Sequence, residues 1–237
     1  MKRGSIGCAA TAVLMFVSLG TEIAEAAEAT GTNERGFYLG AAAGRVEQDA
    51  KGEGQILVGI GGQFGFAVML TPVQTQVDDI QTGWNVTLGY RVNKYLAAEV
   101  AYHDFGEASV VERYVPNFFP LPSEIIVRSN IEAFGPSVSL LGTVPVTPSL
   151  DVFVRGGVLF LDQEVERQFA TLRSTQRTGD EIWMVGAGAQ WSFASRWAAR
   201  LEYQLTDDMD YGGSLFQQNR AGTEKIEQLS LGVLFDF

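Results

Sequence analysis

The chain has 237 residues, a formal net charge of −11 and one cysteine. The length suits one all-β barrel domain, and the acidic balance argues against nucleic acid as a partner because phosphate binding needs basic patches. Cys8 lies in a leader-like N-terminus, so the rest of the chain has no cysteine and disulfides are excluded there.

The N-terminus has the three parts of a secretory signal peptide. Lys2 and Arg3 precede an apolar stretch over residues 6–19, and Ala24-Glu25-Ala26 provides a cleavage pattern. The apolar stretch is too short to span a membrane as a helix. We therefore predict a signal peptide over residues 1–26, with a second cleavage pattern three residues later, and a β-barrel domain over residues 27–237.

Alternating apolar and polar residues predict eight strands, because successive side chains of a strand face opposite sides. They cover about residues 36–46, 82–92, 95–105, 131–142, 150–162, 182–193, 197–205 and 229–237. The last strand carries an apolar residue at every second position and ends on Phe237. This pattern is typical of a strand with lipid on one side and a polar interior on the other.

The connections between these strands alternate in length. Long ones cover residues 47–81, 106–129, 163–180 and 206–224, and short ones cover 93–94, 143–149 and 194–196. In an antiparallel barrel with an even number of strands, every second connection lies on the same rim, and bacterial outer-membrane barrels have long extracellular loops and short periplasmic turns. The fold class we predict is therefore all-β, an eight-stranded antiparallel up-and-down transmembrane β-barrel in the cell outer membrane, with both termini in the periplasm.

Aromatic residues support this orientation. One group lies near the predicted outer strand ends, namely Trp84, Tyr102, Phe160, Trp183 and Tyr203. A second group lies near the periplasmic ends, namely Phe37, Tyr90, Tyr95, Trp191, Phe193, Trp197, Phe235 and Phe237. Two such girdles are expected at the two membrane interfaces.

Several segments carry a resemblance to a known family. They are residues 36–40 (GFYLG), 98–106 (AEVAYHDFG), 186–188 (GAG), 200–203 (RLEY) and 231–237 (LGVLFDF). The chain resembles the OmpA-like eight-stranded outer-membrane barrels of Gram-negative cell envelopes. Because it stops at Phe237, we expect no peptidoglycan-binding domain of the kind that some family members append.

Charged residues on the predicted inner face form the best-defined candidate site. Glu99, Arg155, Arg200 and Glu202 are expected in the barrel interior, with Arg91, His103 and Gln204 as neighbours. An eight-stranded barrel is just wide enough for side chains to fill it, and buried charges must pair. The network is expected to plug the lumen, as inward Glu and Arg residues do in related barrels; the alternative is a narrow pore whose selectivity these charges would set.

Catalysis and metal binding find little support. His103 is the single histidine, and a histidine at the barrel rim is expected to be solvated; Ser109 nearby lacks a nucleophile motif. Asp207, Asp208 and Asp210 lack the glycine and distal glutamate of a calcium loop. We expect no enzyme activity, no cofactor and no metal.

Two of the long connections are unusually apolar, at residues 56–70 and 114–122. Exposed apolar surface usually marks contact with a partner, a ligand or membrane. The first segment either packs over the barrel mouth, extends the adjoining strands, or adds a hairpin that would make ten strands. The second either binds something outside the cell or packs on itself.

The function that these features favour is non-enzymatic. We expect a monomer that contacts outer-membrane lipid and lipopolysaccharide, contributes to envelope integrity, and presents its loops to an extracellular ligand or host surface. The alternatives are a small porin-like passive channel and a carrier of a hydrophobic ligand.

Overall fold

The computed structural model describes residues 35–51, 54–60, 66–116, 124–169, 172–206 and 222–237. The predicted signal peptide (1–26) and the acidic residues Asp207, Asp208 and Asp210 lie outside these residues. In the described part of the chain, no helix is long and apolar enough to cross a membrane.

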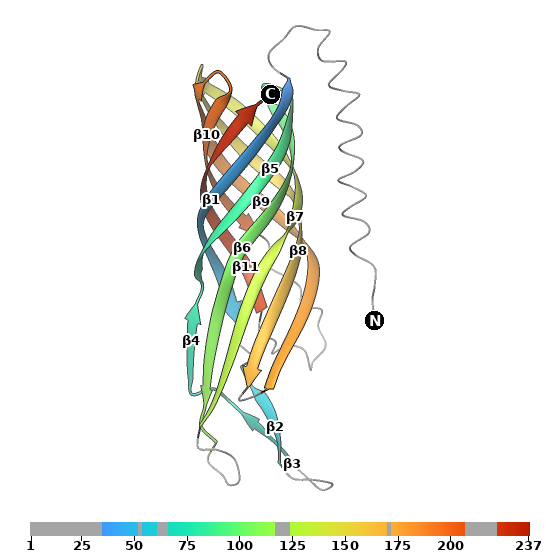
Figure 1. Ribbon diagram of the computed structural model, residues 1–237, viewed down its shortest axis with the longest axis vertical. Helices are drawn as coiled ribbons and strands as arrows, with labels where there is room; N and C mark the ends of the chain where they lie inside the picture. Colours follow the sequence, from blue (N-terminus) through green and yellow to red (C-terminus); the bar gives the residue numbers. More distant parts are fainter. Residues whose placement is uncertain (1–34, 52–53, 61–65, 117–123, 170–171, 207–221) are drawn as a thin grey trace.

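Eight strands form a closed antiparallel barrel (Figure 1). They are β1 (Gly36–Lys51), β5 (Ile80–Asn93), β6 (Leu96–Tyr114), β7 (Ile125–Thr147), β8 (Leu150–Phe169), β9 (Leu172–Ala194), β10 (Trp197–Thr206) and β11 (Gly222–Asp236). Each strand pairs with its neighbour in the chain, and the pairing of β1 with β11 closes the ring. The predicted fold class is confirmed.

The two faces of the wall differ as the alternation predicted. On β5, Trp84, Val86 and Leu88 are exposed, whereas Asn85 and Thr87 between them are buried. The exposed positions face the surroundings of the barrel and the buried ones face its interior. Leu140, Val154 and Leu231, on other strands of the wall, are also exposed, so the apolar outer surface is not confined to one strand.

The two ends of the barrel are different. At one end, here called the turn end, adjacent strands are joined by two-residue turns and the C-terminus lies beside the start of β1 (Figure 1). The aromatic rings predicted for this end contact one another, with centroids 4.8 Å apart for Phe37 and Tyr90 and 5.0 Å apart for Trp197 and Phe235. The opposite end is called the loop end.

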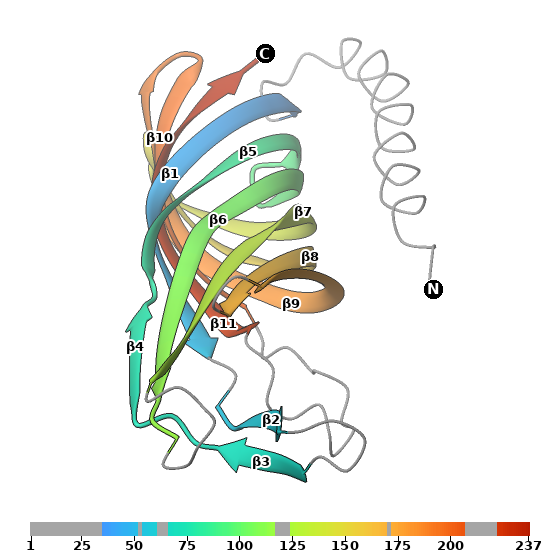
Figure 2. The same ribbon diagram turned by 60° about the horizontal axis from the view of Figure 1, so that its bottom comes forward.

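At the loop end the strands are much longer than predicted. β7 and β9 have 23 residues each, whereas about 9–11 residues suffice to cross a bilayer. The predicted long connections at 106–129 and 163–180 are wrong in extent, because most of these residues continue the strands. β6 to β9 thus project beyond the barrel as a sheet (Figures 1 and 2).

A bulge explains why one strand boundary was placed too early. The pairing of β6 with β7 shifts between Asp104 and Glu107, and Gly106 has a φ of 78° there. The Asp104 carboxylate accepts a hydrogen bond of 2.9 Å from the Gly106 amide. A glycine usually interrupts a strand, but here its positive φ lets the strand bend and continue.

The first apolar segment forms structure of its own. Within the described residues, β2 (Ile56–Ile60) pairs only with β3 (Phe66–Leu70), as a two-stranded sheet apart from the barrel wall. β4 (Gln74–Asp78) pairs with the projecting part of β6. The alternative of ten barrel strands is therefore wrong. The second apolar segment lies mostly outside the described residues.

The barrel interior is packed with apolar side chains on both sides of its polar middle. A cluster near the turn end contains Tyr38, Ala97, Leu141, Phe153, Ala198 and Leu234. A second cluster, toward the loop end, contains Val46, Phe105, Ala133, Leu159, Leu161, Ile182, Met184 and Ile226. Their inward positions were not singled out from the sequence.

Candidate functional site

The four predicted interior charges lie together in the middle of the barrel. Glu99 comes from β6, Arg155 from β8, and Arg200 and Glu202 from β10, where alternate positions face inward. The two carboxylate oxygens of Glu99 are divided between the arginines: Oε1 lies 2.6 Å from Arg200 Nη1, and Oε2 pairs with Arg155. Arg155 Nη1 also lies 3.1 Å from Glu202 Oε1. The network thus links three strands across the lumen.

Burial makes the pairing of these charges necessary. The Glu99 and Arg155 side chains are 0% and 2% exposed, so neither has water to solvate it. Removing an ion from water carries a penalty of several kcal/mol, which only close pairing and hydrogen bonds offset. Two acids and two arginines give the group no net charge.

Tyr38 is a fifth member that sequence reasoning missed. Its hydroxyl donates a hydrogen bond of 2.5 Å to Glu99 Oε1, and its ring lies 4.7 Å from the Arg91 guanidinium. Tyr38 and Gly40 both lie on the inner face of β1, with the exposed Leu39 between them, so the strand pattern could have found Tyr38. The ring lies against Gly89, where an added Cβ would come within 2.1 Å of a ring carbon.

Arg200 is held by neutral groups as well. Its Nη2 donates a hydrogen bond of 3.1 Å to Gln190 Oε1, and its guanidinium lies 4.9 Å from the centroid of the Phe153 ring. Amide and aromatic contacts of this kind orient a planar guanidinium. The arginine is therefore fixed in direction and not only neutralised.

The three predicted neighbours of the network have different positions. Arg91 lies nearer the turn end and pairs with Asp236. Gln204 lies beside the Met184 sulfur. His103 is fully buried, so the expectation of a solvated histidine is wrong: its Nε2 lies 2.9 Å from Ser137 Oγ and its ring stacks on Phe105. The inward register of β6 carries the ring into the lumen.

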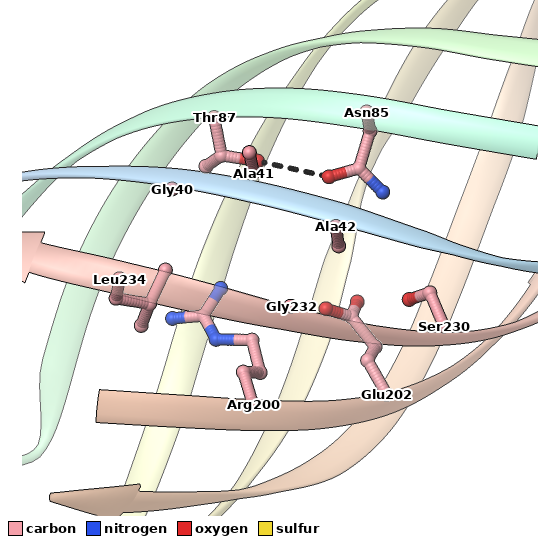
Figure 3. A pocket seen from close by; sticks show the side chains of 10 residues that line it. All are labelled: Gly40, Ala41, Ala42, Asn85, Thr87, Arg200, Glu202, Ser230, Gly232 and Leu234. Carbon is pink, nitrogen blue, oxygen red and sulfur yellow. Dashed lines mark hydrogen bonds between the residues drawn. The ribbon is translucent and has the colours of Figure 1, made fainter. Parts of the chain in front are cut away.

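A small cavity adjoins the network between β1, β5, β10 and β11. It has a volume of about 10 Å³ and is lined by Gly40, Ala41, Ala42, Asn85, Thr87, Arg200, Glu202, Ser230, Gly232 and Leu234 (Figure 3). A cavity of this size has room for about one water molecule. Among the described residues, no group of three or more His, Cys, Asp or Glu side chains could hold a metal ion.

The projecting sheet carries a second concentration of charge. Glu107, Glu132 and Glu164 are direct cross-strand partners on β6, β7 and β8, at the base of this sheet. Partial burial, and then the carboxylates of Glu107, Glu164, Asp104 and Glu166, raise the pKa of Glu132 above its ordinary value. Arg177 forms an ion pair of 2.6 Å with Glu164 at one end of the row.

A closed barrel with an apolar outer surface, two aromatic girdles and a paired polar interior defines a β-barrel of the bacterial outer membrane. The model of the OmpA-like transmembrane domain matches residues 32–237, and the chain belongs to this family. The protein is located in the outer membrane. The turn end is then the periplasmic end and the loop end the extracellular end.

The chain is similar to a curated relative and to solved structures. Outer membrane protein A of Serratia marcescens is 24% identical over 162 residues, which are 66% of this chain and 40% of that protein. The outer membrane protein OprG from Pseudomonas aeruginosa has a similar structure, with a TM-score of 0.51 and 13% identity over 86% of this chain and 97% of that one. Neisserial surface protein A has a TM-score of 0.49 and 15% identity over 85% and 97% of the two chains.

Proposed function

We propose that this protein is a non-enzymatic, closed barrel that contributes to envelope integrity and presents an extracellular β-sheet for surface interaction. The observation that carries the proposal is the projection of β6 to β9 beyond the outer aromatic girdle. On β9, residues 172–182 precede Trp183 of that girdle. At about 3.3 Å per residue, such a segment reaches roughly 35 Å along the strand.

The outer face of this sheet is suited to contact with polar partners. Exposed ion pairs lie on it, including Arg113 with Glu124 at 2.6 Å and Arg173 with Glu166 at 2.8 Å. Such exposed pairs add little to stability, so a role in recognition accounts better for their number. Arginine is also enriched among residues that dominate interfaces.

The filled interior favours a closed barrel and argues against an open channel. Apolar clusters lie on both sides of the ion network, and the cavity beside it has room for only about one water molecule. Single-channel recording on the protein in planar bilayers tests this part. We expect no steady openings between −150 and +150 mV, voltages on the order of a typical membrane potential; stable, ion-selective openings would establish the channel alternative.

The single histidine also favours a non-enzymatic role. His103 and Ser137 form a hydrogen-bonded pair, but both are fully buried in the lumen. A nucleophile and its base need access to substrate. Incubation of the inserted protein with fluorogenic ester and peptide substrates should therefore give no turnover.

Shortening the projecting sheet tests surface interaction separately from folding. Glu164 and Arg177 are cross-strand partners, so residues 164–177 can be replaced by an Asn-Gly turn without changing the register. Cells that carry the shortened protein should keep their resistance to detergent and lose adherence to coated surfaces, relative to cells with the intact protein. Equal adherence of both strains would contradict the proposal.

A further inference from the structure

One edge of the projecting sheet is open at β4. The strand pairs on one side with β6, and among the described residues no strand pairs with its other side. All five residues of β4 are exposed, and the strand lies at the margin of the sheet in both views (Figures 1 and 2). Its last residue, Asp78, pairs with Ser109, which lies beyond Tyr102 of the outer girdle on β6. The open edge is therefore outside the membrane, where its backbone donors and acceptors can pair with an extended chain.

The residues of β4 do not protect this edge from pairing. Natural edge strands are usually protected by charged residues, proline or bulges. The other open edge is the first part of β9, residues 172–183, which pairs with β8 alone in the described part of the chain. It carries four charged residues, namely Arg173, Arg177, Asp180 and Glu181. β4 (QTQVD) carries one charge, at its end, and its pairing with β6 has no bulge. Of the two open edges, β4 is thus the one suited to pairing.

Apolar side chains beside this edge indicate what the partner presents. Val77 of β4 is 41% exposed, whereas its cross-strand partner Val110 is buried. Val73, directly before the strand, is 63% exposed. Both valines lie beyond the outer girdle, where lipid does not cover them, and exposed apolar surface of this kind marks contact with a partner. An apolar residue opposite Val77 in an added strand would extend the row of Val110 and Val77 and remove it from water.

We infer that β4 binds an extended segment of another protein by strand addition. In this mode of recognition, backbone hydrogen bonds supply affinity and alternate side chains supply specificity. The segment that fits has apolar residues at alternate positions, on the side of Val77, and a basic residue beside Asp78 and Asp79, where the strand ends. The inference rests on the proposed function, and it names the part of the sheet that binds and the class of its partner.

A second copy of the chain fits this edge less well. Two copies in one membrane have the same orientation, so their β4 strands would run in the same direction. Parallel pairing is slightly less stable than antiparallel pairing, and it would place the Asp78 carboxylates of the two copies close together. A partner outside the cell has no such constraint and can pair in the antiparallel direction.

Peptide binding tests the inference. The probe is a fluorescein-labelled peptide that alternates valine and threonine between two terminal lysines, and its control has proline in place of the central valine, because proline cannot donate to a strand pair. Fluorescence anisotropy measures binding to the protein in detergent micelles. Val77→Lys should weaken binding of the valine peptide roughly 5-fold or more, since it replaces an apolar cross-strand contact by a charge.

The matched control is Thr175→Lys on the open part of β9, which adds the same charge and should leave binding unchanged. Equal urea midpoints of the two variants verify that both are folded. Cross-linking locates the peptide: in a Cys8→Ser background an introduced cysteine is the single thiol of the chain. A peptide with a central cysteine should form a disulfide with Gln76→Cys under oxidised glutathione, and not with Thr175→Cys.

Three results would overturn the inference. They are equal affinity of the valine and proline peptides, equal affinity of the unchanged protein and Val77→Lys, and disulfide-linked dimers of Gln76→Cys without peptide, which would make a second copy the occupant. Adherence of cells distinguishes this failure from that of the proposed function. If the protein shortened at residues 164–177 loses adherence but the peptide does not bind β4, the sheet acts through another surface and the inference alone fails. If the peptide binds as expected and shortening leaves adherence unchanged, the proposed function alone fails.

Discussion

At the scale of single residues, the interior depends on Glu99. It accepts from Tyr38 and forms ion pairs with Arg155 and Arg200, so three side chains from three other strands converge on one carboxylate. The geometry joins β1, β8 and β10 to β6 across the lumen. Removing the Glu99 carboxylate would leave Arg155 and Arg200 buried with less negative charge to pair with.

Glu99→Gln should therefore destabilise the barrel strongly. Removing one partner of a buried ion pair typically costs about 3–5 kcal/mol. Urea unfolding in detergent micelles measures the change. The matched control is Glu47→Gln, because Glu47 pairs with Arg45 at 3.4 Å while both side chains are more than half exposed; this pair should contribute less than about 1 kcal/mol. Similar unfolding midpoints for both variants would refute the ion-pair account.

A second residue-scale prediction concerns the close approach of Tyr38 to Gly89. Gly89→Ala would place a methyl group on the Tyr38 ring and move its hydroxyl away from Glu99, and overpacking of this kind costs about 1–3 kcal/mol. Gly156→Ala is the control, since an added Cβ there meets nothing within 4 Å. We expect the urea midpoint of unfolding to fall for Gly89→Ala and not for Gly156→Ala. If both variants lose the same stability, the cause is strand propensity and not packing against Tyr38.

At the scale of elements, the wall changes character along the strands. Within the membrane every strand has two partners, whereas in the described residues beyond it β4 and the first part of β9 pair on one side only. The sheet of β4, β6, β7, β8 and β9 is thus open where the barrel is closed. Open edges allow the sheet to twist outward and offer surface to the medium.

The acidic row at the base of this sheet should make its stability depend on pH. Because the pKa of Glu132 is raised in the folded protein, its charge opposes folding: stability is highest below its unfolded pKa and falls as pH rises through the folded value. Glu132→Gln should therefore stabilise the protein at pH 7 by about 0.2–1 kcal/mol, toward the lower end because water screens the row.

The stabilisation by Glu132→Gln should fade at pH 4 and in high salt. Urea unfolding at pH 7 and pH 4 measures it. Glu166→Gln is the control on the same face, because Glu166 has an ion-pair partner in Arg173 at 2.8 Å. It should give no gain at pH 7. A gain in Glu132→Gln that is the same at pH 4 would exclude charge repulsion as the cause.

At the scale of the whole molecule, the barrel is packed from the inside and solvated by lipid on the outside. Leu161 is 1% exposed and Leu231 is 63% exposed, although both lie on strands of the same wall. The inner leucine contacts a fixed apolar cluster. The outer one contacts lipid chains, which can adjust to a smaller side chain.

The same substitution should therefore differ by face. Leu161→Ala should cost about 2–5 kcal/mol because it leaves a cavity, whereas Leu231→Ala should cost less than about 1 kcal/mol, near the difference in membrane transfer. Unfolding of the two variants in lipid vesicles provides the comparison. Equal losses would mean that the interior is not the packed core.

Much of this architecture could be predicted from the sequence alone. Alternation along the strands, the C-terminal Phe237 and the aromatic girdles depend only on which way neighbouring side chains point, and that is a local property of a strand. The same reasoning assigns Glu99, Arg155, Arg200 and Glu202 to the inward face, and in the structure these side chains are buried. The end of β6 was predicted too early, because a glycine such as Gly106 usually interrupts a strand. Only the pairing of β6 with β7 shows that Gly106 lies in a bulge.

By itself, the sequence determined the class of fold and the inner and outer faces of the strands, since a period of two requires no knowledge of distant contacts. The tertiary structure alone decided which charge meets which, how Tyr38 reaches Glu99 over Gly89, why His103 is buried, and how far the strands project. These features depend on register across the ring and on the shapes of side chains from separate strands. Local patterns do not encode them, because each is set by partners that are tens of residues away.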